Sequence, residues 1–533
     1  MLAQMLSYLK TGQRTPMADV KTPQVENSAG GYVWKIDCWS QLVRFLVLGT
    51  SAGSYYASAR KLTLENAEAV MQCMEADGLR TVRTIVDIST GGRAPRNDAA
   101  ILALAMCLKA GDLSTRKAAA DAVVQVCRTG THLFQLATAV DAMGGWGRVT
   151  RRAFSRWYQR NDVDSLAYQV SKYRQRDGWS HRDVLRKAHP APPSSAHDAL
   201  YRWVTKGELS AGAPARLGLV GEAAHADSVE AVVRLITDHG LVREEVPTRF
   251  LGDRHVWDAL LRSGRGMPLT AMLRNLAKMT SIGLLSSSST ATRHVYRKLT
   301  DAEQLRRARI HPLQVLVALN TYRRGQGVKG KLSWTPDRTV LKALDKAFEL
   351  SFESVPRTGK RHLLAVDVSG SMSWSEIAGM TGITPAIGAA AMAAVTHRVE
   401  ASCHLTAFST KLCTVKLARN ASLQTVQDKF DSISMGGTNC ALPMLHALKH
   451  RLPVDTFVVY TDSETWHGKV HPAEALRRYR DAMGIDARLI VVGMVSNGFT
   501  IADPDDKGML DVVGFDTTAP SLMARFTMGE LDG

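Results

Sequence analysis

The residues whose types and spacing most clearly indicate chemistry lie in the C-terminal third of the chain. The sequence DVSGSM, residues 367–372, places a carboxylate and two hydroxyls directly after a short apolar run. A threonine in the turn MGGTN and an aspartate after the run TFVVY supply two further oxygen donors. The five candidate ligands are Asp367, Ser369, Ser371, Thr438 and Asp462. Carboxylate and hydroxyl oxygens are hard ligands, so the set predicts a divalent metal site with Mg²⁺ as the expected cofactor.

The alternative for DVSGSM alone is a serine-rich turn without a ligand. The order of all five donors after successive apolar runs favours the metal site, because ligands gather at the carboxyl ends of strands in an open α/β sheet. Glu464 and His467 are close in sequence, and we interpret them as solvated loop residues. With no base placed beside an open metal position, we expect no catalysis.

A second candidate site is the segment SKYRQRDGWSHRDVLRKAHP, residues 171–190. It interleaves basic residues with the rings of Tyr173, Trp179, His181 and His189, and Asp177-Gly178 predicts a turn between two helices. Its cations are Lys172, Arg174, Arg176, Arg182, Arg186 and Lys187. Cations contact phosphates and flat rings stack on unpaired bases, so the segment predicts binding to single-stranded or looped RNA.

The segment just upstream adds to this basic character. Arg148, Arg152 and Arg156 recur at four-residue spacing, which places them on one face of a helix. The alternative for both segments is a solvated helix face whose aromatic residues belong to the core. Composition alone does not decide between the two interpretations.

The type of secondary structure that the sequence predicts around these residues changes near residue 360. Before it, apolar residues recur at helical spacing in runs of ten to sixteen residues joined by short polar turns, which predicts stacked antiparallel helix pairs, an α-solenoid. Asn97 and Ser114 are candidate helix caps, and Leu64, Ala67, Met71 and Met74 form a stripe ending at Gly78.

The C-terminal part has a different pattern. Four continuous apolar runs alternate with helical segments, such as 386–399 and 472–483, which predicts a doubly wound α/β domain with a parallel sheet. The runs are HLLAV (362–366), HLTAF (404–408), TFVVY (456–460) and RLIVV (488–492). We place the domains at 1–360 and 361–533.

Charge separates the same two parts. The chain has 533 residues and a net charge of +17, whereas residues 361–533 contain 15 basic and 18 acidic residues. The first 360 residues therefore carry +20, which favours a polyanionic partner such as nucleic acid. Seven cysteines without a C-x-x-C pair, no export signal and no apolar stretch of 18 residues predict a soluble cytoplasmic protein with no membrane partner.

The oxygen donors resemble a known metal site. Asp367, Ser369 and Ser371, followed by Thr438 and Asp462, resemble the metal-ion-dependent adhesion site (MIDAS) of von Willebrand factor A domains. The resemblance implies an A-type fold for residues 361–533. It also raises an alternative function for the whole chain, a metal-dependent protein-interaction module in which RNA binding is incidental.

A second resemblance runs from about residue 30 to the end of the chain. Seven segments are similar to the Ro autoantigen family, which is built on the TROVE module. They are LGTSAGSYY (48–56), KLTLENAEA (61–69), THLF (131–134), KYRQRDGWSHRDVLR (172–186), PLTAMLRNLAKMT (268–280), ARIHPLQVLVAL (308–319) and SNGFTIADPDDKGMLDVVGFD (496–516).

This resemblance implies a ring of HEAT-like helix pairs with the A-type domain where the ring's ends meet. It implies that small noncoding Y-like RNA binds the outer face, and that the central hole accepts single-stranded ends of misfolded or precursor RNA. The matching Y-RNA positions are Lys172, Arg176 and His189, and we expect the first two to lie one helical turn apart as a phosphate clamp. An exoribonuclease partner and a monomeric state are further expectations.

One motif is interpreted as a decoy. GQGVKGKL, residues 325–332, satisfies two nucleotide-binding patterns, but Leu332 replaces the expected hydroxyl and the preceding segment has helical periodicity. We therefore predict a flexible basic loop there. A metal-dependent nuclease is the least favoured function.

Overall fold

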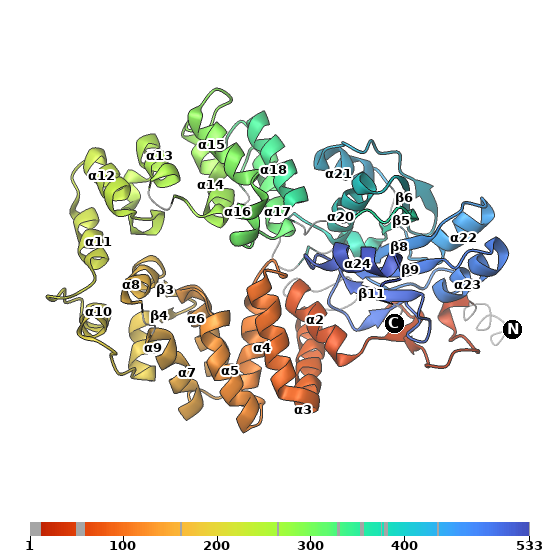
Figure 1. Cartoon of the computed structure of the whole chain (residues 1–533), viewed down its shortest axis with the longest axis horizontal. Helices are drawn as coiled ribbons and strands as arrows, with labels where there is room; N and C mark the ends of the chain where they lie inside the picture. Colours follow the sequence, from red (N-terminus) through yellow and green to blue (C-terminus); the bar gives the residue numbers. More distant parts are fainter. Residues whose placement is uncertain are drawn as a thin grey trace.

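The computed structural model shows a ring of helices joined to an α/β domain at one side (Figure 1). It describes residues 12–49, 59–159, 162–263, 266–327, 331–351, 356–374, 376–377, 382–433 and 436–531. The segment 48–56, which carries part of the family resemblance, lies mostly outside the described residues.

Successive helices follow one another around the ring. Each packs against the adjacent helix or the one after it in the sequence, as α3 does with α4 and α5. The first half comprises α2 (Cys38–Leu48), α3 (Ala59–Gly91), α4 (Asp98–Ala110), α5 (Leu113–Val126), α6 (Gly130–Ala142), α7 (Arg148–Tyr158), α8 (Val163–Lys172), α9 (His181–Ala188) and α10 (Ser195–Lys206). The second half comprises α11 (Ala215–His225), α12 (Val229–His239), α13 (Arg254–Arg262), α14 (Leu269–Ser281), α15 (Thr290–Leu299), α16 (Ala302–Arg307), α17 (Pro312–Arg324) and α18 (Arg338–Leu350). The predicted α-solenoid is confirmed.

Two local predictions about helix ends need correction. The cap of α5 is Asp112, whose side chain accepts a hydrogen bond from the Thr115 N–H, and Ser114 lies inside the helix. Asn97 stands at the N-cap of α4 but makes no side-chain cap hydrogen bond. An aspartate two residues before the expected cap competes well for that position, because its carboxylate accepts from the free N–H groups.

The predicted stripe on α3 is also wrong in part. Leu64 is 57% exposed, whereas Leu62, Val70 and Cys73 are buried. The helical trace does not end at Gly78 but is kinked at Asp77 and runs on to Gly91. At a kink the apolar face is set by packing against neighbouring helices, here α2, α4 and α5, and simple periodicity does not report that face.

The α/β domain contains a six-stranded sheet in the order β11-β9-β8-β5-β6-β7. The four predicted runs are its central strands β5 (Arg361–Asp367), β6 (Ser402–Phe408), β8 (Thr456–Thr461) and β9 (Arg488–Gly493), all parallel. The sequence interpretation missed the edge strands β7 (Leu412–Thr414) and β11 (Met509–Val513). These strands are short and only partly buried, so they lack a continuous apolar run.

Alternate residues of the central strands belong to different cores, which shows that both sheet faces are covered. Leu364 and Val366 of β5 join the cluster that includes helix α20, whereas Leu363 and Ala365 join the cluster of α22 and α23. The helices are α19 (Gly370–Trp374), α20 (Pro385–Val399), α21 (Leu423–Asp431), α22 (Leu442–Lys449), α23 (Pro472–Met483) and α24 (Ala519–Thr527). The predicted doubly wound arrangement is confirmed.

The N-terminal residues 12–36 pack on the α/β domain, although the expected boundary assigns them to the helical part. Strand β1 (Val25–Glu26) pairs with β2 (Tyr32–Lys35), and β2 pairs with β10 (Phe499–Thr500). Gln13, in the 3₁₀ turn η1 (Gly12–Arg14), donates a hydrogen bond to the Asn439 side chain at 2.9 Å. The described part of the chain therefore starts on the α/β domain at residue 12, runs around the ring and returns to that domain.

Two arginines fasten the start of the ring to the α/β domain. Arg44 of α2 is fully buried and pairs with Asp511 of β11 at 2.5 Å. Arg93, just after α3, forms a two-pronged contact with Asp516, with nitrogen–oxygen distances of 3.1 and 2.5 Å. Bidentate pairs of this kind fix geometry, because two parallel hydrogen bonds leave little freedom of rotation.

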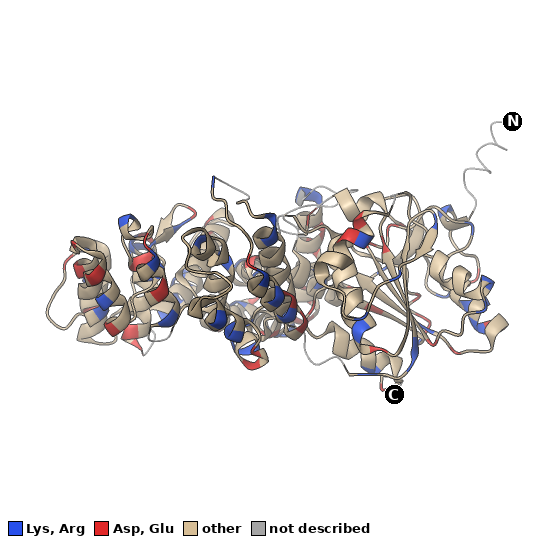
Figure 2. Cartoon of the chain, turned by 90° about the horizontal axis from the view of Figure 1, so that it is seen from above, with Lys and Arg blue, Asp and Glu red and all other residues tan. Residues whose placement is uncertain are grey.

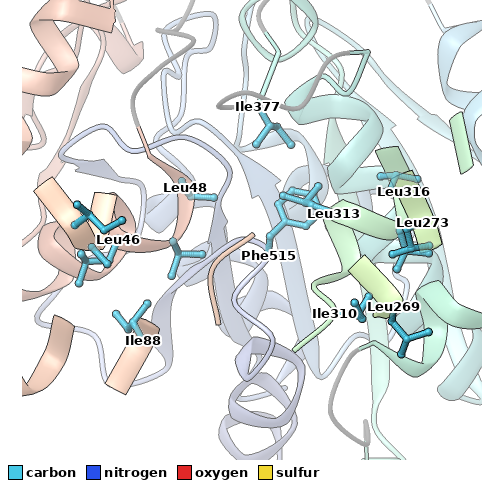
Figure 3. Close-up of a cluster of buried hydrophobic side chains, with 14 of the residues drawn as sticks. Leu46, Leu48, Ile88, Leu269, Leu273, Ile310, Leu313, Leu316, Ile377 and Phe515 are labelled. Carbon is cyan, nitrogen blue, oxygen red and sulfur yellow. The ribbon is translucent and has the colours of Figure 1, made fainter. Parts of the chain in front are cut away.

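The end of the ring meets its start at the same place. His311, which caps α17, lies with its Nε2 atom 2.7 Å from the Phe515 carbonyl oxygen and 3.2 Å from that of Arg93. Gln314 donates to the Pro95 carbonyl at 2.6 Å. Figure 3 shows Phe515 in the same apolar cluster as Leu48 of α2 and Leu313 of α17. We call this meeting of the segments 92–97, 309–314 and 511–517 the closure junction.

The decoy segment 325–332 follows a helix and not a strand, because Gly325 ends α17. Residues 328–330 lie outside the described residues. The preceding helix confirms that the strand required by a nucleotide-binding loop is missing in the described part.

The closure junction predicts a pH dependence of stability. Burial lowers the pKa of His311 to about 4, from the usual 6.5, and the neutral ring uses both nitrogens because Nδ1 accepts from the Leu313 N–H. Below pH 6.5, a proton therefore binds His311 more readily in the unfolded chain than in the folded one. The contribution of neutral His311 to the free energy of unfolding is full above pH 6.5 and is lost as the pH falls toward 4. Between pH 7 and pH 5 we expect His311 to account for about 2 kcal/mol of lost stability.

Urea denaturation of the wild type and His311→Gln at both pH values checks this. The variant should lose less stability on acidification than the wild type, although it is less stable at pH 7. His239→Gln, which changes an exposed histidine at the end of α12, is the matched control and should keep the wild-type pH dependence. Equal pH dependence in His311→Gln and the wild type would contradict the assignment.

Candidate functional site

The five predicted metal ligands come from three loops at the carboxyl ends of the parallel strands. Asp367 ends β5, Ser369 and Ser371 follow it into α19, Thr438 lies in the loop after α21, and Asp462 follows β8 directly. Each is at most 3% exposed. The strand β5 pairs with β8, so the two aspartates emerge side by side at one edge of the sheet.

Hydrogen bonds join four of these residues. Ser369 donates its N–H to Asp367 Oδ1 at 2.9 Å, and the hydroxyl oxygens of Ser369 and Ser371 are 3.1 Å apart. The Ser371 hydroxyl hydrogen-bonds to Asp462. The neighbouring Thr461 hydroxyl donates to Asp367 Oδ2 at 2.7 Å. The structure therefore brings the residues of the first and third loops into one cluster.

Negative charge accumulates there without a basic counter-charge. Burial, followed by repulsion from Asp462, raises the pKa of Asp367 to about 7, and burial also raises the pKa of Asp462. Among the described residues, no lysine, arginine or histidine is one of the largest causes of either pKa shift. Two buried carboxylates that repel each other are stabilised by a bound cation.

The fifth residue supports the same conclusion. The Thr438 hydroxyl is buried and has no hydrogen-bond partner among the described residues, which is unusual because buried polar groups are nearly always paired. No group of three or more His, Cys, Asp and Glu residues in the described part of the chain has the geometry of a metal site. A site here therefore depends on the hydroxyls together with Asp367 and Asp462, and such a set fits a hard cation that keeps some of its water.

The interpretation of Glu464 as a solvated residue is wrong. Its side chain is buried, and burial followed by repulsion from Asp462 raises the pKa of Glu464 to about 8. One carboxylate oxygen accepts the Ala29 N–H at 3.1 Å and the other accepts from the Asn497 side chain at 3.3 Å. The N-terminal segment causes this burial, and that long-range contact has no local sequence signal. His467 is exposed, as expected.

The second candidate site is a β-hairpin between two helices. Helix α8 ends at Lys172, strands β3 (Gln175–Arg176) and β4 (Trp179–Ser180) pair, and α9 begins at His181. Asp177 and Gly178 have φ values of 52° and 80°. The predicted Asp-Gly turn is confirmed, and two positive φ values in a two-residue loop indicate a type I′ turn.

The proposed phosphate clamp has a different geometry from the expected one. Arg176 lies on β3, so Lys172 and Arg176 are not one helical turn apart. Lys172 is half-buried, with Nζ 2.7 Å from the Tyr168 hydroxyl, whereas Arg176 is exposed. The cations of Lys172 and Arg216 both contact the Tyr168 ring, at 5.0 and 4.8 Å from its centroid. Tyr168 therefore holds Lys172 in place, a role that sequence analysis missed.

The remaining predicted RNA-binding residues surround the hairpin. Arg174, Arg182 and His189 are exposed, and so is Arg152 on α7. Ser155 of α7 donates to the carbonyl of Ala188, the last residue of α9, so the helices carrying Arg152 and His189 are adjacent. His189 is the C-cap of α9 with φ at 48°, and its ring remains at the surface.

Two expectations about this surface do not hold. His181 is buried, and the Tyr158 hydroxyl lies 2.7 Å from its Nδ1 atom. Burial lowers the pKa of His181 to about 3, so its ring is a neutral part of the core. Arg156 pairs with Asp121 across α5 and α7, which removes it from the free basic face formed by Arg148 and Arg152.

The charge of the ring is mixed at short range. Figure 2 shows basic and acidic residues interspersed along its helices. The +20 excess of residues 1–360 is therefore spread over many elements, and local geometry decides where an anion is held. In the part of the chain that the structure describes, no helix is long and apolar enough to cross a bilayer.

Comparison with known families gives two matches that together cover most of the chain. Residues 25–208 and 220–324 match the TROVE domain. Residues 361–527 match the Ro60 vWA domain, the A-type domain found in that family. The division between the two matches falls where the helical ring gives way to the α/β domain.

Whole-chain relatives agree with these matches. A protein of Deinococcus radiodurans named RNA-binding protein RO60 is 43% identical over 513 residues, covering 95% of this chain and 96% of the relative. A Caenorhabditis elegans protein with the same name is 35% identical over 597 residues, covering 97% and 92%. The crystal structure of the Deinococcus radiodurans Ro (Rsr) protein aligns at a TM-score of 0.69 with 42% identity, covering 93% of this chain and 100% of that one.

The oxygen cluster predicts stabilisation by a divalent cation. In thermal or urea unfolding, Mg²⁺ at one hundred times its dissociation constant should stabilise the wild type by about 2.7 kcal/mol relative to EDTA. Asp367→Asn should abolish this gain. The same variant should be at least as stable as the wild type in EDTA, because it removes one of two repelling buried charges.

Asp455→Asn is the matched control. It removes an aspartate at the opposite end of β8, where Asp455 pairs with Arg361. This control should be destabilised yet keep the response to Mg²⁺. If Mg²⁺ stabilised Asp367→Asn as much as the wild type, the ion would bind elsewhere.

Proposed function

The chain belongs to the Ro60 family, and on that premise we propose that it is a noncatalytic RNA-binding protein acting in RNA quality control, processing or decay. Two full-length relatives are named RNA-binding proteins, and one of their solved structures shares this fold. The single observation that carries the proposal is the exposed cationic hairpin and its flanking helices on a ring with an excess of positive charge.

Small noncoding Y-like RNA binds the outer surface of the ring at this hairpin. Lys172, Arg176 and His189 are the principal contacts, with Arg174, Arg182 and Arg152 around them. The support is geometric: five of the six side chains are exposed, and Tyr168 holds the half-buried Lys172 in a defined position. Fixed cations lose little entropy when they bind phosphates.

The central hole accepts single-stranded ends of misfolded or precursor RNA. The closure junction supports this, since a ring joined at Arg93, His311 and Asp516 admits a chain end by threading and resists entry from the side. An exoribonuclease is the expected protein partner, and the protein acts as a monomer in the cytoplasm. The ring recognises shape and charge, so many RNA sequences are accepted.

Replacing Lys172, Arg176 and His189 by alanine together should weaken binding of a Y-like RNA while leaving the fold intact. Phosphate contacts release counterions, so losing two cations should make the slope of log affinity against log salt shallower by about 1.5. A filter-binding titration at several salt concentrations measures both effects.

The matched control replaces Lys206, Arg234 and His239 by alanine. All three residues are exposed, with Lys206 and His239 at the ends of α10 and α12 and Arg234 in the middle of α12, and the control removes the same charges from another part of the ring. It should show a much smaller loss and the wild-type salt slope. Equal losses in the two triple variants would mean that overall charge, and not this site, holds the RNA.

A second function is supported by the oxygen cluster. A divalent ion held by Asp367, Ser369, Ser371, Thr438 and Asp462 supplies an open coordination position for a carboxylate of a protein partner. The unpartnered Thr438 hydroxyl and the two repelling aspartates support it. This activity is compatible with RNA binding, because the two sites lie on different domains.

Pull-downs separate this second function from RNA-mediated association. A partner bridged by the ion should remain on the wild-type protein after ribonuclease treatment and be lost with Asp367→Ala or EDTA. A partner that survives in Asp367→Ala but disappears after ribonuclease treatment is held by RNA. That result would remove the support for metal-dependent docking.

A further inference from the structure

Two tryptophans from different elements form a pair beside the cationic hairpin. Trp146 follows α6 in the loop before α7, and Trp179 lies on β4. Their ring centroids are 5.7 Å apart and the rings are inclined by 33°. Trp146 also packs on the buried Phe154, with centroids 4.2 Å apart. The pair is anchored on the core from one side, and both indoles remain partly exposed.

The backbone around this pair leaves room for a flat ligand. Gly144, Gly145 and Gly147 flank Trp146, and Gly178 precedes Trp179. A side chain added at any of these four glycines would meet no atom within 4 Å. Gly144, Gly145 and Gly178 have positive φ values, which a larger residue would adopt only with strain.

A cation covers the two rings but is held there weakly. The Lys187 ammonium lies 4.9 Å from the Trp179 centroid and 5.7 Å from that of Trp146. It pairs with Asp141 at 2.9 Å, and both side chains are nearly half exposed. Exposed pairs of this kind contribute little, about 0 to 1 kcal/mol, so Lys187 can move aside at small cost.

We propose that Trp179, backed by Trp146, is a stacking platform for one unpaired nucleobase of the RNA bound at the hairpin. The inference rests on the proposed function and extends it from phosphate contacts to a base contact. Stacking on an indole tolerates every base, because each base presents a π face. On binding, Lys187 moves off the rings and contacts the phosphate beside the stacked base, close to the exposed Arg182 and Arg186 of its own helix.

This platform predicts a preference for RNA with an unpaired base over fully paired RNA. Base stacking on an aromatic side chain contributes about 1 to 3 kcal/mol, which corresponds to roughly 5- to 150-fold in affinity. A paired helix cannot offer a free base face, so it gains nothing from Trp179. Phosphate contacts by Lys172 and Arg176 hold both kinds of RNA.

The test compares two RNA hairpins of equal length whose strands are joined by the same non-nucleotide linker, one fully paired and one with a single bulged 2-aminopurine. Trp179→Leu keeps apolar volume on the core but removes the flat ring, and it should weaken binding of the bulged hairpin about tenfold. Its affinity for the paired hairpin should not change. Trp179→Phe should stay close to the wild type. The 2-aminopurine fluorescence should be quenched by the wild type and not by Trp179→Leu.

Trp203→Leu is the matched control, because Trp203 is a half-buried tryptophan of α10 packed on the same core. It should bind both hairpins like the wild type. Unchanged affinity and unchanged quenching in Trp179→Leu would overturn the platform while the Lys172, Arg176 and His189 variant still tests the phosphate site. If the wild-type protein bound neither hairpin, the proposed function itself would fail.

Discussion

The ring depends on the contact between its two ends and the α/β domain. At the closure junction, Asp516 holds Arg93 and the Phe515 carbonyl oxygen lies against His311, so one short loop of the C-terminal domain touches both the start and the end of the ring. Arg44 and Asp511 add a second buried pair a few residues away. Buried ion pairs of this kind fix the relative positions of the segments they join more than they raise the free energy of unfolding, because desolvation offsets much of their attraction. What they fix here is the position of one end of a solenoid relative to the other.

Closure also affects the candidate metal site, because this site lies in the domain that joins the ring's ends. The N-terminal segment crosses that domain before the ring begins, and Ala29 hydrogen-bonds to Glu464 two residues from Asp462. Asn497, in the loop that precedes β10, contacts both Glu464 and the carbonyl of Asp462, and its own oxygens face Arg44. A continuous set of hydrogen bonds therefore connects the oxygen cluster with the first helix of the ring. The two domains share a buried polar network and are not merely tethered by a linker.

The surface around the cationic hairpin is built on a different principle. Its hairpin carries exposed cations, but the residues beneath them are locked: Tyr168 holds Lys172, the buried His181 contacts Tyr158, and Trp146 packs on Phe154. Rigid support reduces the entropy that each cation loses on binding. Acidic residues are interspersed among the basic ones along the ring, and like charges repel a polyanion. The positions of the cations around the hairpin therefore define this candidate site better than the total charge of +20 of residues 1–360 does.

The sequence by itself determined the α-solenoid, the four central strands and the α/β class, because periodicity is a local property. The five candidate oxygen donors were predicted from their positions at strand ends, which are also local. The sequence also determined the Asp-Gly turn, which depends on two adjacent residues. Only the tertiary structure decided that Glu464 is buried, that Arg176 is on a strand, that His181 is in the core and that Trp146 meets Trp179. Each of these depends on a partner from a distant segment or a neighbouring element, such as Ala29 for Glu464, and a residue's own neighbours in the chain carry no record of that contact.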